Sequence, residues 1–213
     1  MTNGDENTTD RIIRTAEPRD IEAIATALTE AFFDDPVWGP LFPDPALRRA
    51  QANQYWRFMV TEALRLPESV VAETPSGELI AVAVWFPPGA EEVSEERVPA
   101  YEAMVRELLD VEQAEAMFAS GASFGEARPK APHAYLTLLA VAPGWQGRGE
   151  GMGLLRTTLE RYDAAGIPTY LESSNPANDA RYERLGYLPQ GLITAGDGAS
   201  AQTYWRDAAP AQA

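Results

Sequence analysis

The sequence predicts a domain of the α/β class. Short apolar runs rich in strand-forming residues alternate along the chain with longer stretches whose apolar residues recur at helical spacing. One such run, YLTLLAV at residues 135–141, leads through a glycine-rich loop into a helical pattern with Leu154, Leu155 and Leu159 on one stripe. At 213 residues, the chain has the length of one domain with a substantial core.

The first half of the chain is expected to form a strand, two helices and a β-hairpin. Pro36 ends the first helix, because a proline disfavours helical backbone in the residue before it. Pro75-Ser-Gly77 supplies the turn of the hairpin. The expected elements are a disordered lead at 1–10, a strand at 11–15, helices at 17–33 and 46–65, and strands at 69–74 and 79–86.

The second half is expected to add helices, the strand–loop–helix unit and a closing hairpin. An acidic helical stretch at 91–120, with Glu91 and Glu92 on its outer face, is expected to break near Asp110 and to be followed by a loop at 121–132. Further strands are expected at 135–141, 169–174, 187–193 and 201–205, and a short helix at 176–184. These elements add up to a mixed sheet of about seven strands flanked by helices. The predicted organisation is a single domain at 11–206, with an insertion at about 91–120 and a tail at 207–213.

The loop at residues 146–151 is the most informative motif. Its glycines lie between a strand and a helix, where backbone N–H groups can approach an anion and the helix dipole favours negative charge. A Walker loop is excluded, because Glu150-Gly151 stands where Lys-Ser/Thr would be needed. A dinucleotide fingerprint is excluded, because Met152 or Leu154 occupies the position of its third glycine. A Gln-x-x-Gly-x-Gly loop for a phosphorylated ligand remains.

A second motif follows on the next strand, and the two together resemble the GNAT superfamily of N-acetyltransferases. It reads Leu171-Glu-Ser-Ser-Asn-Pro-Ala-Asn178 and continues as Arg181-Tyr-Glu-Arg-Leu-Gly-Tyr187. The two motifs cover about residues 135–187, and the order of elements extends the resemblance over most of the chain. Trp85-Phe-Pro-Pro-Gly89 and Leu-Glu-Ser-Ser are most similar to the puromycin N-acetyltransferase-type branch. The resemblance implies a GNAT-like central twisted sheet and acetyl-CoA as co-substrate.

The resemblance also implies where acetyl-CoA binds. Backbone amides of the loop would hold the pyrophosphate, and the pantetheine arm would lie along the end of the preceding strand, where a free N–H polarises the thioester carbonyl. Arg148 would reach the 3′-phosphate or remain solvated, and both alternatives stay open. The expected cofactor-binding residues are Leu139, Ala140, Val141, Gln146, Gly147, Arg148, Gly149, Gly151, Met152, Asn175 (also expected to cap the short helix) and Asn178.

The catalytic residues are expected on the second motif. The resemblance makes Tyr182 the general acid that protonates the departing thiolate, because a phenol with a pKa of roughly 10 keeps its proton at neutral pH. The alternative role for Tyr182 is a buried aromatic that braces the last helix. Glu172 is the leading carboxylate for the general base, with His133 and a water chain to solvent as alternatives. Asp34 and Asp35 are expected to bind the amine in the acceptor pocket.

Glu150 departs from the family pattern, which usually has an aliphatic residue at this position. The departure matters because the position lies beside the site for two phosphates. If the side chain points to solvent, the effect on cofactor binding is small. If it points inward, we expect weaker cofactor binding.

The composition excludes several kinds of chemistry. With no cysteine and one histidine, the chain has no disulfide, thiol nucleophile or Cys/His zinc site, and we expect no metal. Its 17 basic and 32 acidic residues give a net charge of −15, which repels nucleic acid and anionic membranes but attracts a cationic amine. The sequence has no apolar run long enough to span a membrane, and its first ten residues are polar and acidic, so we expect a cytoplasmic protein.

The sequence therefore predicts an acetyl-CoA-dependent N-acetyltransferase that transfers the acetyl group directly to a primary amine of a small molecule. Two alternatives stay open. One is a non-catalytic CoA-binding regulatory module, and the other is an enzyme that acetylates a protein N-terminus or a lysine. A homodimer also stays open, and the sequence predicts neither the acceptor amine nor a role in antibiotic resistance.

Overall fold

The computed structural model describes residues 11–195 and 198–209. These residues form one seven-stranded sheet in the order β1-β2-β3-β4-β5-β7-β6. β4 and β5 run parallel and the other neighbouring strands are antiparallel, so the predicted mixed α/β sheet is confirmed. The strands are β1 Ile12–Thr15, β2 Val70–Glu73, β3 Leu79–Phe86, β4 Ala134–Val141, β5 Thr169–Ser173, β6 Leu188–Thr194 and β7 Ser200–Arg206.

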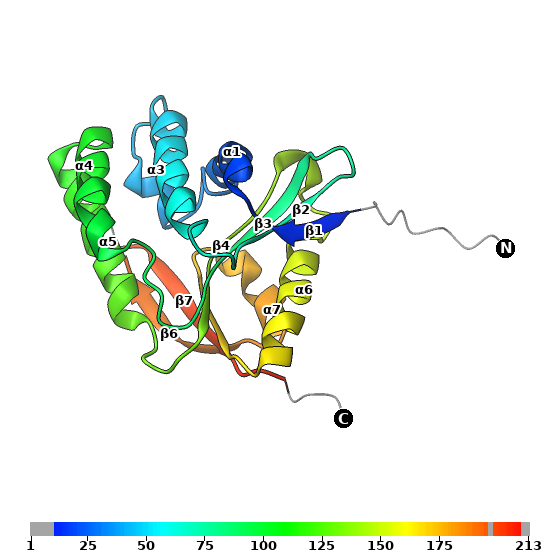
Figure 1. Ribbon diagram of the computed structural model, residues 1–213. Helices are drawn as coiled ribbons and strands as arrows, with labels where there is room; N and C mark the ends of the chain where they lie inside the picture. The colour runs from blue at the N-terminus through cyan, green and yellow to red at the C-terminus, as the bar shows by residue number, and fades with distance from the viewer. Residues whose placement is uncertain (1–10, 196–197, 210–213) are drawn as a thin grey trace.

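Helices cover both faces of the sheet (Figure 1). α1 and α3 lie over one face with α4 and α5 beside them, and α6 lies against the other face. A separate cluster of buried apolar side chains fills each of the two interfaces. The helices are α1 Ile21–Ala31, α2 Trp38–Leu41, α3 Arg48–Ala63, α4 Val98–Leu108, α5 Val111–Ala127, α6 Glu150–Ala165 and α7 Asp179–Glu183, with 3₁₀ turns η1 Pro18–Asp20, η2 Glu95–Arg97, η3 Pro143–Trp145 and η4 Pro176–Asn178.

Strand β3, in the middle of the sheet, is apolar at every position because both of its faces are covered. Val82 and Val84 belong to the cluster under α1 and α3, whereas Ala83 and Trp85 belong to the cluster under α6. Trp85 is fully buried, and its ring centroid lies 4.7 Å from that of Tyr162 on α6. The two layers of helices are therefore anchored on one strand, which lies next to β4.

The acidic helical stretch differs from its prediction at one end. The break near Asp110 is confirmed, since the Asp110 side chain caps α5 by accepting a hydrogen bond from Gln113 N at 2.9 Å. The loop predicted from Gly121 onwards is wrong, because α5 continues to Ala127. Phe124 explains the extension, since its ring stacks on Trp38 at 6.4 Å and this packing outweighs the low helix propensity of glycine.

The ends of the described chain meet the predictions in part. The predicted lead at 1–10 lies outside the described residues, as do 210–213 of the predicted tail and the tip of the closing hairpin at 196–197. The closing hairpin itself is confirmed, since β6 and β7 pair in antiparallel register. Within the tail, Ala209 N donates to Asp163 Oδ1 at 2.7 Å, so this part of the chain is attached to α6.

Two irregularities shape the middle of the sheet. The parallel register of β4 with β5 covers Ala134–Leu136 and Thr169–Leu171 and ends there, although β4 continues for five more residues. In the β3–β4 register, Trp85 pairs with Leu136 and the next pair is formed by Leu138, which leaves Thr137 as a β-bulge. A bulge redirects side chains and bends its strand, and bulges occur often beside active sites. β4 and β5 therefore diverge at the bulge.

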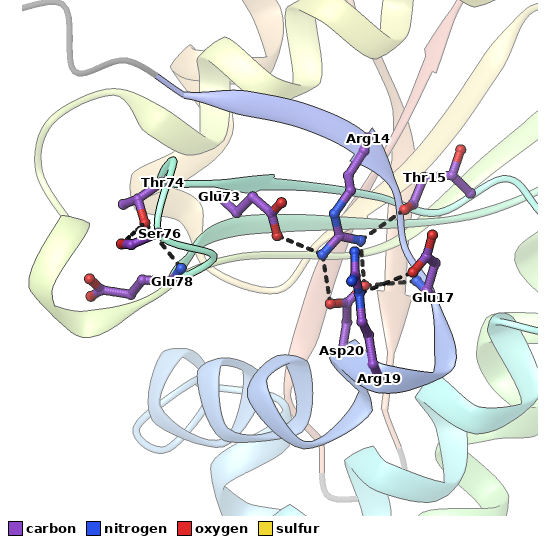
Figure 2. Close-up of polar contacts among 9 residues, drawn as sticks. All are labelled: Arg14, Thr15, Glu17, Arg19, Asp20, Glu73, Thr74, Ser76 and Glu78. Carbon is purple, nitrogen blue, oxygen red and sulfur yellow. Dashed lines mark hydrogen bonds and ion pairs between the residues drawn. The ribbon is translucent and has the colours of Figure 1, made fainter.

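Arg14 on the edge strand β1 joins three segments, as Figure 2 shows. Its terminal nitrogens donate to both carboxylate oxygens of Asp20 at 2.7 and 2.8 Å, and one of them donates to Glu73 Oε2 at 2.6 Å. Asp20 also accepts from the backbone N–H of Glu17 at 2.8 Å. The hydrogen bonds from Arg14 lower the pKa of both carboxyl groups, Asp20 and Glu73. The network fastens β1 to β2 and to the start of α1.

Candidate active site

A cavity of about 620 Å³ opens where β4 and β5 diverge. Its walls come from the segment between α1 and α2, from α3, α4 and α5, and from the last residues of β4 and β5. The cavity thus lies at the carboxyl ends of the two parallel strands, which is where α/β sheets commonly bind ligands. The bulge at Thr137 lies in its wall.

The glycine-rich loop lies beside this cavity, at the N-terminus of α6. Gly147 and Gly149 have φ angles of 78° and 82°, a left-handed conformation that favours glycine. The hydrogen bonding of the helix begins at Gly153, whose N–H donates to Gly149 O at 2.9 Å, so the amides of the preceding turn have no acceptor within the helix. Such a group of free amides fits the oxygens of a diphosphate.

Gly151 brings the first turn of α6 close to the end of β4. A Cβ atom at this position would lie 2.9 Å from Val141 Cγ2, closer than two carbon atoms can approach. The glycine therefore sets the distance between the amides at the helix N-terminus and the strand that leads into the cavity.

Glu150, in the same turn, is paired with Arg11, the residue before β1. Arg11 Nη1 donates to Glu150 Oε2 at 2.8 Å, and the Glu150 side chain is 12% exposed. The Arg11 guanidinium also packs against Gly153, where a Cβ would lie 2.8 Å from Nη1. Glu150 is therefore neither solvated nor unpaired, and a cation balances its charge beside the loop.

The expected cofactor-binding residues fall into two groups. Six of them line the cavity: Leu139, Ala140, Val141, Gln146, Asn175 and Asn178. The others, Gly147, Arg148, Gly149, Gly151 and Met152, lie in the loop and the first turn of α6. Gln146 Nε2 donates to Val141 O at 3.3 Å, which ties the loop to the strand. The Arg148 guanidinium lies over the Trp145 ring, 5.0 Å from its centroid, and the side chain is exposed.

The two asparagines lie at the turn that follows β5. Asn175 caps this turn as predicted, with Oδ1 accepting from Ala177 N at 3.0 Å. Asn178 Oδ1 accepts from Arg181 Nη1 at 2.9 Å. Both asparagines line the cavity.

Tyr182, on α7, lines the cavity and is 8% exposed. Its ring lies 6.2 Å from that of Tyr187 and 6.0 Å from that of Tyr204. Burial raises the pKa of Tyr182, and the nearby carboxylate of Asp179 adds to the rise. The phenol is therefore protonated at neutral pH, as a proton donor must be, and both expected roles of this residue, donor and aromatic brace, fit its surroundings.

Glu172, near the end of β5, has a buried carboxylate oxygen, Oε1, that forms no hydrogen bond with the described residues. The Tyr170 hydroxyl, two residues earlier on the same strand, is likewise buried and makes no hydrogen bond of ordinary geometry. It lies near enough to Glu172 to oppose the rise in the pKa of that carboxyl group. Burial raises the pKa of Glu172 to about 8, with the Tyr135 hydroxyl opposing the rise and the charge of Glu92 adding to it. A carboxyl group with this pKa binds and releases protons near neutral pH.

The sequence did not indicate Glu92 and Arg128 as residues of the cavity wall. Glu92 was expected on the outer face of a helix, but it precedes η2, is half-buried, and accepts hydrogen bonds from Arg128 Nη2 and, at 2.9 Å, from Thr137 Oγ1. The Arg128 guanidinium lies 4.0 Å from the centroid of the Tyr135 ring. The stretch contains several glutamates in a similar sequence context, so the sequence could not show which of them faces the cavity.

The two aspartates expected in the acceptor pocket differ in position. Asp35 lines the cavity, but both of its oxygens are already bonded: Oδ1 to the N–H groups of Val37 and Trp38, and Oδ2 to Ser174 Oγ at 2.7 Å. Its bonds join the α1–α2 segment to the end of β5. Asp34 lies outside the cavity, and its side chain is 89% exposed and 3.8 Å from Arg48.

His133, the alternative base, lies outside the cavity and precedes β4 directly. It is buried, its Nδ1 lies 2.7 Å from Ala131 O, and its ring packs edge-on against Tyr170 and Trp205. Burial lowers its pKa, so the ring is neutral at pH 7. These contacts make His133 part of the packing between β4, β5 and β7.

The described residues hold no group of three or more His, Cys, Asp or Glu side chains that could bind a metal ion. Among the helices of the described part of the chain, none is long and apolar enough to cross a membrane.

The fold is that of an acetyltransferase. A family model for the acetyltransferase (GNAT) domain matches residues 72–206, which include β3, β4, the glycine-rich loop and the segment with Glu172 and Tyr182. The chain belongs to this family. It is an N-acetyltransferase, and the family uses acetyl-CoA as co-substrate, in keeping with the amide-rich turn beside the cavity.

Solved structures of acetyltransferases share the fold. The "histone acetyltransferase HPA2 and related acetyltransferase" of Corynebacterium glutamicum is 25% identical with a TM-score of 0.69, and the match covers 95% of this chain and 99% of that one. Arylalkylamine N-acetyltransferase 2 of Aedes aegypti is 12% identical with a TM-score of 0.60, covering 94% and 100%. The polyamine N-acetyltransferase of Drosophila melanogaster is 16% identical with a TM-score of 0.56, covering 93% and 100%.

Proposed function

We propose that this enzyme transfers the acetyl group of acetyl-CoA directly to a primary amine of a small molecule. One observation carries the proposal. The cavity where β4 and β5 diverge is lined both by a protonated phenol, Tyr182, and by Glu172, a carboxylate with an unpartnered buried oxygen. Direct transfer needs a proton donor for the departing thiolate and an acceptor for the proton of the amine, and these two residues supply them.

Glu172 is the proposed general base. An alkylammonium has a pKa of roughly 10, so an ordinary carboxylate with a pKa of about 4 is a poor acceptor for its proton. Burial raises the pKa of Glu172 to about 8, which brings the two values closer. The amine nitrogen, once it has given its proton to Glu172, attacks the thioester carbonyl carbon, and the carbon–sulfur bond breaks as the acetamide forms.

Tyr182 is the proposed general acid. It gives its proton to the thiolate sulfur, so the products are the acetamide and CoA in its thiol form. As the acetamide forms, its nitrogen loses a second proton to solvent. Tyr182 regains a proton from solvent and Glu172 releases the first one, so each turnover releases one proton overall. The unpaired amides around Gly149 would hold the diphosphate, and Asn175 and Asn178 lie where the pantetheine arm would pass.

A small acceptor is favoured over a peptide because helices wall the acceptor side of the cavity. α3, α4 and α5 and the α1–α2 segment all contribute lining residues. The solved relatives named above include enzymes for arylalkylamines and polyamines, which are small amines. The finer assignment to the puromycin N-acetyltransferase-type branch stays a prediction, supported by Trp85-Phe-Pro-Pro-Gly89 and Leu171-Glu-Ser-Ser174.

The test measures thiol release from acetyl-CoA with 2-phenylethylamine, putrescine, puromycin and a lysine-rich peptide as acceptors. We expect amine-dependent release with at least one small amine, and Tyr182→Phe to lower kcat by about a hundredfold. Tyr204→Phe is the matched control, because Tyr204 packs on Tyr182 but does not line the cavity, and it should keep most of the activity.

Three results would contradict parts of the proposal. Release that is fastest with the peptide would favour protein acetylation. Full activity of Tyr182→Phe would remove the general acid and leave Tyr182 as a brace. CoA binding in calorimetry with no release on any acceptor would favour the regulatory module.

A further inference from the structure

We infer that the acceptor is an arylalkylamine: a monocation whose primary amine is joined by a short chain to an aromatic ring. The inference rests on the proposed function, since it names the acceptor class of the same cavity. The observations that carry it are the aromatic walls of the cavity and the state of each carboxylate that lines it.

The acceptor side of the cavity is walled by a chain of aromatic rings. They come from four different helices and contact one another in sequence, with centroid distances of 6.0 to 6.4 Å; the rings are Phe124, Trp38, Tyr55, Tyr101 and Phe118. Four of these five residues remain partly exposed, although they lie inside a folded domain, and Tyr55 is buried. Partly exposed aromatic rings around a hollow mark a binding site for an apolar body.

Trp38 and Phe124 lie at one end of this chain of rings. Their rings are stacked with an interplanar angle of 20° at 6.4 Å. Met59 and Met117 also line the cavity, and methionine side chains adapt to the edges of aromatic ligands. An aromatic ring gains both buried area and ring contacts in such surroundings, while an alkyl chain gains buried area alone.

The carboxylates of the cavity leave room for one positive charge. Asp35 has both oxygens bonded, and Glu92 is held by Arg128 and Thr137. Glu91 and Glu102 are exposed, where solvent and salt weaken their attraction for a ligand. Of the described carboxylate oxygens, Glu172 Oε1 is the one that is buried without a partner.

A second ammonium group would be unfavourable further inside. Arg128 also lines the cavity close enough to Glu172 to interact with its charge, is 16% exposed, and already pairs with Glu92. A diamine would have to place its second ammonium beside Arg128 or bury it unpaired among the rings, and both arrangements are strongly unfavourable. The negatively charged surface attracts cations in general, but we expect the cavity to bind an acceptor with a single positive charge.

The test compares three amines of similar length in the thiol-release assay: 2-phenylethylamine, hexylamine and 1,6-diaminohexane. We expect kcat/KM for 2-phenylethylamine to exceed that for hexylamine by about tenfold, because ring contacts contribute on the order of 1 kcal/mol. The diamine should be at least about tenfold worse than hexylamine, because its second charge would be buried unpaired.

Phe124→Leu tests the wall directly, since Phe124 lines the cavity and is partly exposed. Circular dichroism should show that α5 stays folded, because the ring also stacks on Trp38. We expect KM for 2-phenylethylamine to rise about fivefold while KM for hexylamine changes by less than about twofold. Trp38→Phe is a second variant with a milder change of volume and should act in the same direction. Phe33→Leu is the matched control, because Phe33 packs on Arg48 and Arg49 outside the cavity.

The outcomes separate this inference from the proposed function. Hexylamine or the diamine as the best acceptor, or equal effects of Phe124→Leu on both monoamines, would overturn the aromatic monocation and keep the N-acetyltransferase of small amines. No turnover with any of the three amines, together with turnover of a peptide, would overturn both.

Discussion

The cluster around Arg14 at the sheet edge and the cluster around Glu172 in the cavity are built from the same kinds of residue, but they are bonded differently. Around Arg14, the carboxylates of Asp20 and Glu73 both accept hydrogen bonds from the guanidinium, and the pKa of each is lowered. Around Glu172, one carboxylate oxygen and the hydroxyl of Tyr170 make no hydrogen bond of ordinary geometry, and the pKa of Glu172 is raised to about 8.

A carboxylate that stabilises the fold can therefore be distinguished from one that is available for chemistry. A carboxylate that is fully bonded in the folded protein contributes stability and has no capacity left for a ligand. A carboxylate that is buried without a partner costs stability, and such a cost persists where a ligand or a proton completes the site. By this criterion Asp35, although it lines the cavity, resembles Asp20 more than Glu172.

The largest expected effect comes from Glu172→Gln. Because the folded pKa of about 8 lies above the unfolded value of 4.5, the folded state binds the proton more tightly, and wild-type stability falls as pH rises from about 4.5 and levels off above about 8. The variant lacks this loss, so chemical denaturation should show it to be more stable by a few kcal/mol near pH 9 and equal near pH 4.

Activity of the same variant should change in the opposite direction. A base must be deprotonated to act, so wild-type kcat should rise with pH towards a plateau above about pH 8. Glu172→Gln should lower kcat by about a hundredfold and should remove this rise of kcat with pH. A pH profile of the variant that parallels the wild type would assign the base to another residue or to a water chain. Glu183→Gln, on the exposed side of α7, serves as the control.

The Arg14 cluster should respond with the opposite sign. Arg14→Met removes the guanidinium donors of both Asp20 oxygens and leaves Oδ2 with the Glu17 N–H alone, and we expect a loss of about 2 kcal/mol in the free energy of unfolding at pH 7 with little change in kcat. Because the folded pKa of Asp20 is lowered, this contribution is present above its unfolded pKa and disappears as pH falls through the folded value. Chemical denaturation of wild type and variant at pH 7 and near pH 2 measures the loss and its disappearance at low pH. An unchanged free energy of unfolding at pH 7 would contradict the structural role given to the Arg14 cluster.

The smallest effect is expected at the pair of Arg11 and Glu150, which combines features of both clusters. Its charges are paired through one hydrogen bond, yet it lies at the turn proposed to hold the diphosphate. Arg11→Met should weaken CoA binding about threefold to tenfold in calorimetry, because it leaves a lone negative charge there, and Arg11→Met/Glu150→Gln should restore it. A double variant that binds as weakly as Arg11→Met would show that Arg11 acts on CoA itself.

The sequence predicted those parts of the fold that depend on local pattern. The apolar strands, the stripe of Leu154 to Tyr162 on α6 and the cap at Asn175 all follow from the spacing of neighbouring residues. The continuation of α5 to Ala127 does not, because Phe124 stacks on a tryptophan 86 positions earlier in the chain. Local glycine content gave the wrong answer there.

The same limit applies to the site. The glycine-rich loop could be predicted from the sequence because its function depends on the backbone, and the positions of the glycines indicate where the backbone can adopt the required conformation. The roles of Glu92, Arg128 and the chain of aromatic rings in the cavity wall could not be predicted from the sequence. They depend on contacts between residues that are far apart in the chain. Asp34 and Asp35 are adjacent in sequence and differ entirely in surroundings, which no pattern of polar letters distinguishes.

The brief pairing of β4 with β5 gives the protein a mechanical property. Three residue pairs connect a panel of four strands, β1 to β4, with a panel of three, β5 to β7, while farther along the two strands stand apart. An extended ligand bound in the opening between β4 and β5 would contact both panels at once. We expect a molecule bound in the opening to restrict movement between the two panels, and slower amide exchange in both of them would report its binding.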